Sequence, residues 1–163
     1  MQSFAPYSSI TETAKCLDRQ RLGKQRTECI QMLIALDYHK GSPMAEFLHK
    51  TYGYKSCAPG AKPPYLNHPA TLMWRGHEGG LAHYGLYMCD EWARRGYEGA
   101  RSEEVLMHFL DTYIREADMP EWWGREDIHA SHRAALLYKA PEHYAQFGWT
   151  ETPEYNYIWP TTS

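Results

Sequence analysis

The sequence predicts an all-α protein, a single compact domain of about six helices. Several segments place apolar residues at helical spacing, the clearest being Cys29, Ile30, Leu33, Ile34 and Leu36. No segment shows the clean period-2 alternation that is typical of a strand. The length of 163 residues suits one hydrophobic core. We therefore expect one helical domain spanning residues 1–163.

The first helix is expected to begin near Ser9 and to run to about Gln20. Ser9 and Glu12 have the spacing of a capping box, in which each side chain satisfies a backbone N–H of the first turn. Gly23 indicates a break or a new start. A second helix then carries the apolar stripe and ends before Gly41.

Ser42 and Pro43 are expected to open a short helix, because proline at a first helical position loses no hydrogen bond. Residues 52–66 contain three prolines, two glycines and three tyrosines, which predicts a long surface loop. Loops longer than about 12 residues are often functional.

The next helix is expected to start at a cap on Asn67 and to keep its phase as far as Gly96. Between Gly76 and Gly80 its glycines suggest a kink or the close approach of another chain. Ser102 is expected to cap a further helix, and residues 131–139 form a short one. Pro141 begins a last turn or two, before an aromatic tail over residues 148–163.

Charge is distributed unevenly along the chain, although the net charge is only −3. Residues 1–62 hold nine Lys/Arg against five Asp/Glu, and residues 63–163 hold eight against fifteen. An acidic protein can still present a basic face to a polyanion. There is no secretory signal and no membrane-length apolar run, so we expect a soluble cytoplasmic protein.

The four cysteines lack the tight spacing of a disulfide framework or a zinc knuckle. We expect reduced thiols, with Cys29 and Cys89 as core residues. His129 and His132 could share a helix face as a metal pair, but no third ligand follows at recognisable spacing. We expect no metal and no other cofactor.

Leu17–Glu28 is the most basic segment of the chain. Arginine suits bidentate phosphate contacts, and a carboxylate among arginines stays ionised and can pair with a developing cation. A solvated helix face with an ordinary ion pair explains the same pattern. A second group around His68, Trp74 and His77 predicts a pocket, whereas His77 and His83 lie six residues apart and do not suit one metal ion. The aromatic tail suits core or dimer packing, or a base-stacking platform.

Five segments together resemble a small bacterial and phage family that is grouped with the pyrimidine-dimer DNA glycosylases of the phage endonuclease V type. They read MQSFAPY, LDRQRLGKQRTE, NHPATLMWRG, SHRAALLYKAPEHY and YIWP. The likeness to the small family covers nearly the whole chain. The likeness to the characterised glycosylases rests on the arginine-rich first helices, the His-Pro segment, the helical fold and the aromatic tail.

The resemblance implies a metal-free helical enzyme that flips a base and attacks the sugar C1′ with its N-terminal amine. A Schiff base then leads to strand cleavage. In the family a glutamate of an Arg-Glu pair is the catalytic carboxylate. Carried over, Arg26 matches the arginine of that pair, and Arg19 and Arg21 resemble phosphate-holding residues.

Two positions depart from that pattern. Thr27 follows Arg26, so Glu28 lies one residue further on, a rotation of about 100° on a helix. The second residue is Gln2 rather than a small residue that permits removal of Met1. The α-amine of Met1 is then the expected nucleophile, since α-amines ordinarily have a pKa of about 7.7–8.0, which leaves a neutral fraction. Lys24 is the substitute.

The sequence thus predicts a DNA-binding glycosylase, with or without abasic-site lyase activity, acting on damaged or modified pyrimidines. Two alternatives are a non-catalytic nucleic-acid-binding module and a nucleotide-processing enzyme that uses the His/Trp/Arg pocket. The expected catalytic groups are Glu28, Met1 and Lys24. The expected DNA-binding residues are Lys15, Arg19, Arg21, Arg26, Arg75, His132 and Arg133, and the expected substrate-pocket residues are His68, Trp74 and His77.

Overall fold

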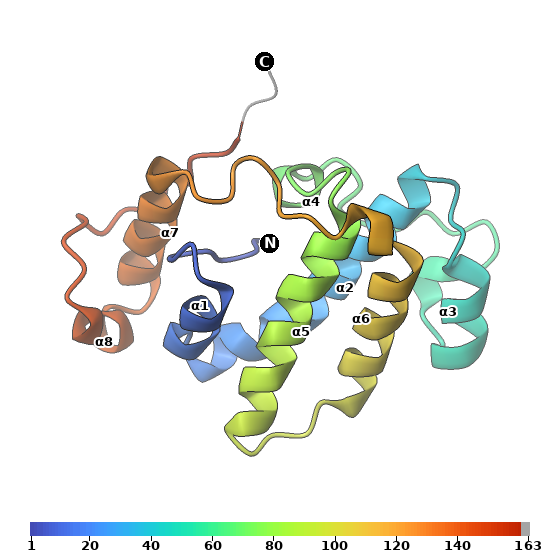
Figure 1. Cartoon of the computed structure of the whole chain (residues 1–163), viewed down its shortest axis with the longest axis horizontal. Coiled ribbons are helices and arrows are strands. Elements are labelled where there is room, and N and C mark those ends of the chain that lie inside the picture. The colour runs from blue at the N-terminus through green and yellow to red at the C-terminus, as the bar shows by residue number, and fades with distance from the viewer. Residues whose placement is uncertain (161–163) are drawn as a thin grey trace.

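The computed structural model describes residues 1–160 and contains eight α-helices and no strand in that range (Figure 1). The longer helices are α1 (Ile10–Cys16), α2 (Arg19–His39), α3 (Ala45–Tyr52), α5 (Glu78–Arg94), α6 (Ala100–Thr112) and α7 (Glu126–Lys139). Two single turns, α4 (Pro69–Leu72) and α8 (Pro141–Tyr144), raise the number above the six expected. Short 3-10 turns cover Lys55–Cys57, Ile114–Glu116 and Ala145–Phe147.

Helices α2, α5 and α6 pack side by side and form the centre of the molecule (Figure 1). The predicted stripe of α2 faces this core, where Cys29 and Leu33 are completely buried. Tyr84 and Met88 of α5 and Phe109 of α6 meet it there, also without solvent exposure. No helix within residues 1–160 combines the length and the apolar character that a bilayer span requires.

The predicted first helix is interrupted earlier than expected. Ser9 caps α1 as predicted, but α1 ends at Cys16 and Leu17 is extended. Asp18 then caps α2 by accepting a hydrogen bond from the Arg21 backbone N–H. Gly23 lies inside α2, where a Cβ would come within 3.0 Å of the Trp92 ring, so the glycine marks a close contact and not a break.

Four other boundaries differ from the prediction. His68, not Asn67, caps α4, because its Nδ1 accepts from the Ala70 N–H at 3.0 Å. The helix expected across Gly76–Gly80 is broken over residues 73–77 and resumes as α5. Gly99, not Ser102, precedes α6, and α7 begins five residues before Ser131. Residues 52–66 form the predicted loop apart from the Lys55–Cys57 turn, and residues 161–163 of the aromatic tail lie outside the described range.

The predicted close approach at the glycine cluster is confirmed at Gly79. A Cβ on this residue would lie 2.9 Å from the Ala117 Cα and closer still to the Tyr113 carbonyl oxygen. The segment that connects α6 to the 3-10 turn Ile114–Glu116 therefore crosses directly over the first turn of α5.

Gly79→Ala is expected to lower the free energy of unfolding by about 3 kcal/mol, because the methyl group meets backbone that cannot rotate away. Urea unfolding followed by circular dichroism measures the loss. Gly53→Ala is the matched control, since its Cβ meets nothing within 4 Å and only its positive φ of 76° adds strain. Equal losses in the two variants would contradict the crossing at Gly79.

Candidate functional site

The first residues of the chain are buried between α2 and α7 (Figure 1). Gln2, Ser3 and Ala5 are at most 2 % exposed. Gln25 of α2 pairs with this segment in both directions: its Oε1 accepts from the Phe4 N–H at 2.9 Å, and its Nε2 donates to the Gln2 carbonyl oxygen at 2.7 Å. The amide of Gln25 thus fixes the segment against α2, and Met1 with it.

A small cavity of about 190 Å³ lies at the end of this segment. Met1, Lys24 and Glu28, the three expected catalytic groups, all line it. The Glu28 Oε2 accepts from the Gln2 backbone N–H at 3.3 Å, one residue from the α-amine. The remaining lining residues are Gln2, Phe4, Gln20, Arg21, Gln25, Lys139, Tyr155 and Tyr157. We call this cavity the N-terminal pocket.

Helical phase explains why Glu28 reaches the pocket although it does not follow Arg26 directly. Residues 21, 24, 25 and 28 are separated by three or four positions and share one face of α2. Arg26 and Thr27 face a different side and line a second, more open cavity of about 710 Å³. The rotation of about 100° between Thr27 and Glu28 therefore turns the carboxylate toward the N-terminal segment.

The N-terminal pocket has an excess of positive charge. Arg21, Lys24 and Lys139 line it with the single carboxylate of Glu28. The Lys139 Nζ lies 4.3 Å from the centre of the Tyr155 ring, a cation–π contact. Arg21 is in part engaged by Asp18, at 3.3 Å. Such a rim suits a phosphate-bearing ligand.

The second cavity carries a surface that we call the cationic platform, formed by Arg19, Arg26, Trp92 and Tyr97. The Arg26 guanidinium lies over the Trp92 ring at 4.4 Å, and that of Arg19 lies 5.8 Å from the Tyr97 ring centre. Lys24 and Gln20 line both cavities. The cationic platform and the N-terminal pocket therefore lie on two neighbouring sides of the same stretch of α2.

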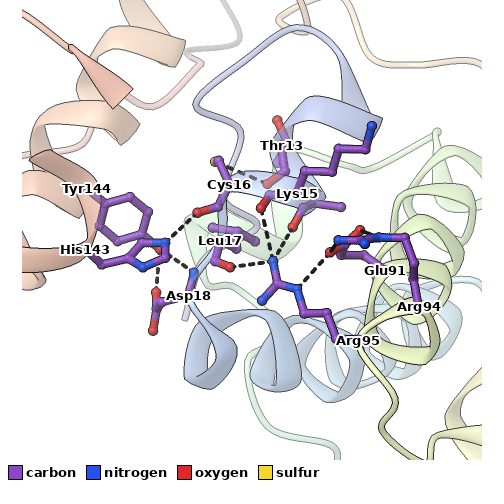
Figure 2. Close-up of polar contacts among 11 residues, drawn as sticks. Thr13, Lys15, Cys16, Leu17, Asp18, Glu91, Arg94, Arg95, His143 and Tyr144 are labelled. Carbon is purple, nitrogen blue, oxygen red and sulfur yellow. Dashed lines mark hydrogen bonds and ion pairs between the residues drawn. The ribbon is translucent and has the colours of Figure 1, made fainter. Parts of the chain in front are cut away.

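Arg95, the residue directly after α5, contacts the segment between α1 and α2, as Figure 2 shows. The Arg95 Nη2 donates to the carbonyl oxygens of Leu17 at 2.8 Å, Lys15 at 3.0 Å and Ala14 at 3.3 Å. Its Nε is held by Glu91 at 2.7 Å. These contacts satisfy carbonyls that the end of α1 leaves free.

The start of α2 is held from the other side by α8 (Figure 2). The Tyr144 hydroxyl contacts the Asp18 carboxylate, and the His143 Nε2 lies 2.9 Å from the Cys16 carbonyl oxygen. Burial would raise the pKa of Asp18, but the hydrogen bonds from Tyr144 and Arg21 outweigh it and lower that pKa. The first turn of α2, which carries Arg19 and Arg21, is thereby given one orientation.

The expected substrate-pocket residues do not come together. Burial lowers the pKa of His68, and the positive α-amine of Met1 lowers it further, but the side chain does not line the N-terminal pocket. Trp74 is completely buried and donates to the Ser3 Oγ at 2.8 Å. The His77 Nδ1 lies 2.9 Å from the Asp118 carbonyl oxygen, near the segment that crosses α5. None of the three lines the N-terminal pocket.

The expected DNA-binding residues divide into two groups. Lys15, Arg19 and Arg75 are exposed, and Arg21 and Arg26 are half-buried beside the two cavities. His132 is completely buried, and Arg133 donates to the Pro6 carbonyl oxygen at 2.7 Å and to Glu126 and Glu151. The structure places the last two among interior contacts instead of on an open surface.

Sequence patterns alone missed several residues of the N-terminal pocket. Gln25 could have been found, since it lies three residues before Glu28 on the same helical face. Lys139, Tyr155 and Tyr157 come from the end of α7 and the tail, and no spacing links them to α2. In residues 1–160 no three His, Cys, Asp or Glu side chains are grouped as metal ligands, and all four cysteines are free and buried.

Comparison with known protein families gives one match. The family model described as pyrimidine dimer DNA glycosylase matches residues 1–104, which include α1, α2, the pocket residues of α2 and the platform residues Trp92 and Tyr97. No curated protein and no solved structure matches the chain. The match covers well over half of the 163 residues. The chain belongs to the pyrimidine dimer DNA glycosylase family.

Proposed function

We propose that the protein is a DNA glycosylase with abasic-site lyase activity whose nucleophile is the α-amine of Met1. The observation that carries the proposal is the N-terminal pocket, where the amino-terminal residue and Glu28 meet under a rim of cations. A glycosylase of this family acts on DNA. The finer assignment, to damaged or modified pyrimidines, belongs to the same proposal.

In the proposed reaction a flipped nucleotide presents its sugar to the pocket. The lone pair of the α-amine forms a bond to C1′ while the N-glycosidic bond breaks. The base leaves with the electron pair of the broken glycosidic bond and takes up a proton. Glu28 stabilises the positive charge that develops on the sugar and accepts a proton from the attacking nitrogen. The C1′–O4′ bond then breaks as the nitrogen lone pair forms the C=N bond of the imine, and O4′ keeps the electron pair of the broken bond and takes up a proton. Loss of a proton from C2′ then expels the 3′ phosphate by β-elimination and breaks the strand.

Lys24 is the competing nucleophile, because its side chain lines the same pocket. Borohydride reduces an imine to a stable amine, so incubation with an oligonucleotide that holds an abasic site should give a covalent complex. Peptide mapping then shows whether Met1 or Lys24 carries the sugar. A complex at Met1 supports the proposal, and a complex at Lys24 shows that Lys24 is the nucleophile instead. Binding without any complex rules out the lyase mechanism, and release of a damaged base then separates a glycosylase without lyase activity from a non-catalytic module.

Affinity for duplex DNA is expected to fall with salt. If Arg19, Arg21 and Arg26 each neutralise one phosphate, the logarithm of affinity should change with the logarithm of salt at a slope of about −2.7. Replacing all three with alanine should flatten that slope in fluorescence anisotropy titrations. Arg115→Ala is the control, since Arg115 is exposed on the 3-10 turn Ile114–Glu116 and borders neither cavity. A slope that is equally steep in the triple variant would contradict the assignment.

A further inference from the structure

Two histidines of α7 contact both polar groups of one residue in the N-terminal segment. The Ala5 N–H donates to the His132 Nδ1 at 2.8 Å, and the His129 Nδ1 lies 2.6 Å from the Ala5 carbonyl oxygen. The two histidines are three residues apart and so share one face of α7. Both are almost completely buried, at 1 % and 0 % exposure.

The hydrogen-bond partners determine the protonation of both rings. The His129 Nε2 accepts from the Gly124 N–H at 3.0 Å, so its proton lies on Nδ1 and is donated to Ala5. The His132 Nδ1 accepts, so its proton lies on Nε2, which has no hydrogen-bond partner within residues 1–160. Each histidine thus needs the neutral form and one particular tautomer to make its contact with Ala5.

The contact is placed where it can control the reacting amine. Ala5 lies four residues after Met1, and four extended residues span about 13–14 Å. Gln25 and Glu28 hold residues 2–4 from the side of α2, and Trp74 and Tyr84 also contact Ser3 and Phe4. The two histidines hold the next residue, Ala5, from the side of α7. The position of a nucleophile strongly affects the reaction rate, since a misplacement of about 1 Å can lower the rate by about 10²-fold.

We propose that His129 and His132 are positioning residues, which clamp Ala5 and thereby hold the α-amine of Met1 within reach of Glu28. The inference rests on the proposed function in one respect, that the α-amine is the nucleophile. Neither histidine lines the N-terminal pocket, so neither touches the substrate. Their effect is therefore expected in the rate of the chemical step and not in the affinity for DNA.

Two substitutions of His132 whose side chains are nearly equal in size distinguish a role of the hydrogen bond to Ala5 from a role in packing alone. In His132→Asn the side-chain oxygen takes the place of Nδ1 and still accepts from Ala5, whereas His132→Leu puts a methyl group there. At saturating abasic-site DNA, the leucine variant should form the borohydride-trapped complex at least about tenfold more slowly than the asparagine variant. Its dissociation constant for DNA should be unchanged. Equal trapping rates, or a loss confined to affinity, would overturn the proposal.

Hydrogen exchange in the wild-type protein tests the clamp without any variant and without DNA. The backbone amide of Ala5, which donates to His132, should be protected as strongly as those in the middle of α2. Free exchange of this amide would show that Ala5 is not held, and would overturn the inference even if the leucine variant fails to fold. Absence of a trapped complex in a wild-type protein with a protected Ala5 amide would instead refute the proposed function and leave the histidine contact standing.

Discussion

Replacing Glu28 with glutamine is expected to lower the rate of base release by about 10²–10⁴-fold, the range for loss of a general acid–base group. Glutamine keeps the shape and an oxygen that can accept the Gln2 N–H, but it carries no charge. A developing positive charge on the sugar is then no longer stabilised. The affinity for DNA should stay level or rise slightly, because the substitution removes a negative charge from a cationic rim.

Single-turnover kinetics and a binding titration on the same variant measure the two quantities separately. Asp90→Asn is the matched control, an exposed carboxylate of α5 that borders neither cavity. The competing interpretation, that Glu28 only pairs with Lys24 or Arg21, predicts unchanged turnover and a stability loss under about 1 kcal/mol. Full activity of Glu28→Gln would therefore establish the ion-pair interpretation and end the catalytic one.

Acid is expected to unfold the protein through His132. Burial, together with the smaller effect of the neighbouring His129, lowers the pKa of this histidine from its ordinary value of 6.5 to about 3. In the unfolded chain His132 therefore binds a proton below about pH 6.5, whereas in the folded protein it binds one only below about pH 3. The free energy of unfolding should fall by about 2 kcal/mol between pH 7 and pH 5, and by about 5 kcal/mol over the whole interval.

Urea unfolding of wild type and His132→Asn at pH 7 and pH 5 isolates this contribution, because asparagine does not titrate. The wild-type protein should lose about 2 kcal/mol more than the variant between the two pH values. Other ionisable groups contribute equally to both proteins and cancel in the comparison. Parallel losses would show that His132 takes up its proton in the folded state.

The helices could be predicted from local patterns, whereas several of their ends could not. The apolar stripe of α2 and the cap on Ser9 depend on residues a few positions apart, and both are confirmed. The break at Leu17 depends on Arg95, which binds the carbonyl of Leu17 from 78 residues away. The predicted break at Gly23 is wrong for a similar reason, since the Trp92 ring that excludes a side chain there belongs to α5.

In the N-terminal pocket, too, residues close in sequence could be predicted to lie together, whereas those distant in sequence could not. Helical phase already brings Lys24 and Glu28 to one face, so the sequence could nominate them together. The sequence also predicts a pocket role for Trp74 and a DNA contact for His132. In the structure Trp74 instead donates a buried hydrogen bond to Ser3, and His132 accepts one from Ala5. Burial of the chain start could not be read from residues 1–6, which carry no periodic pattern long enough to interpret.

The bond between Ala5 and His132 spans 127 positions and so bears on the order of events during translation. The first residues leave the ribosome long before α7 does, and their partners on α7 do not yet exist. Non-local contacts of this kind form late and slow the folding of a chain. Helices α1, α2 and α5 can associate beforehand, but the reactive end of the molecule is assembled only when nearly the whole chain has emerged. A truncated product would therefore lack the N-terminal site altogether, although it retains every residue of α2.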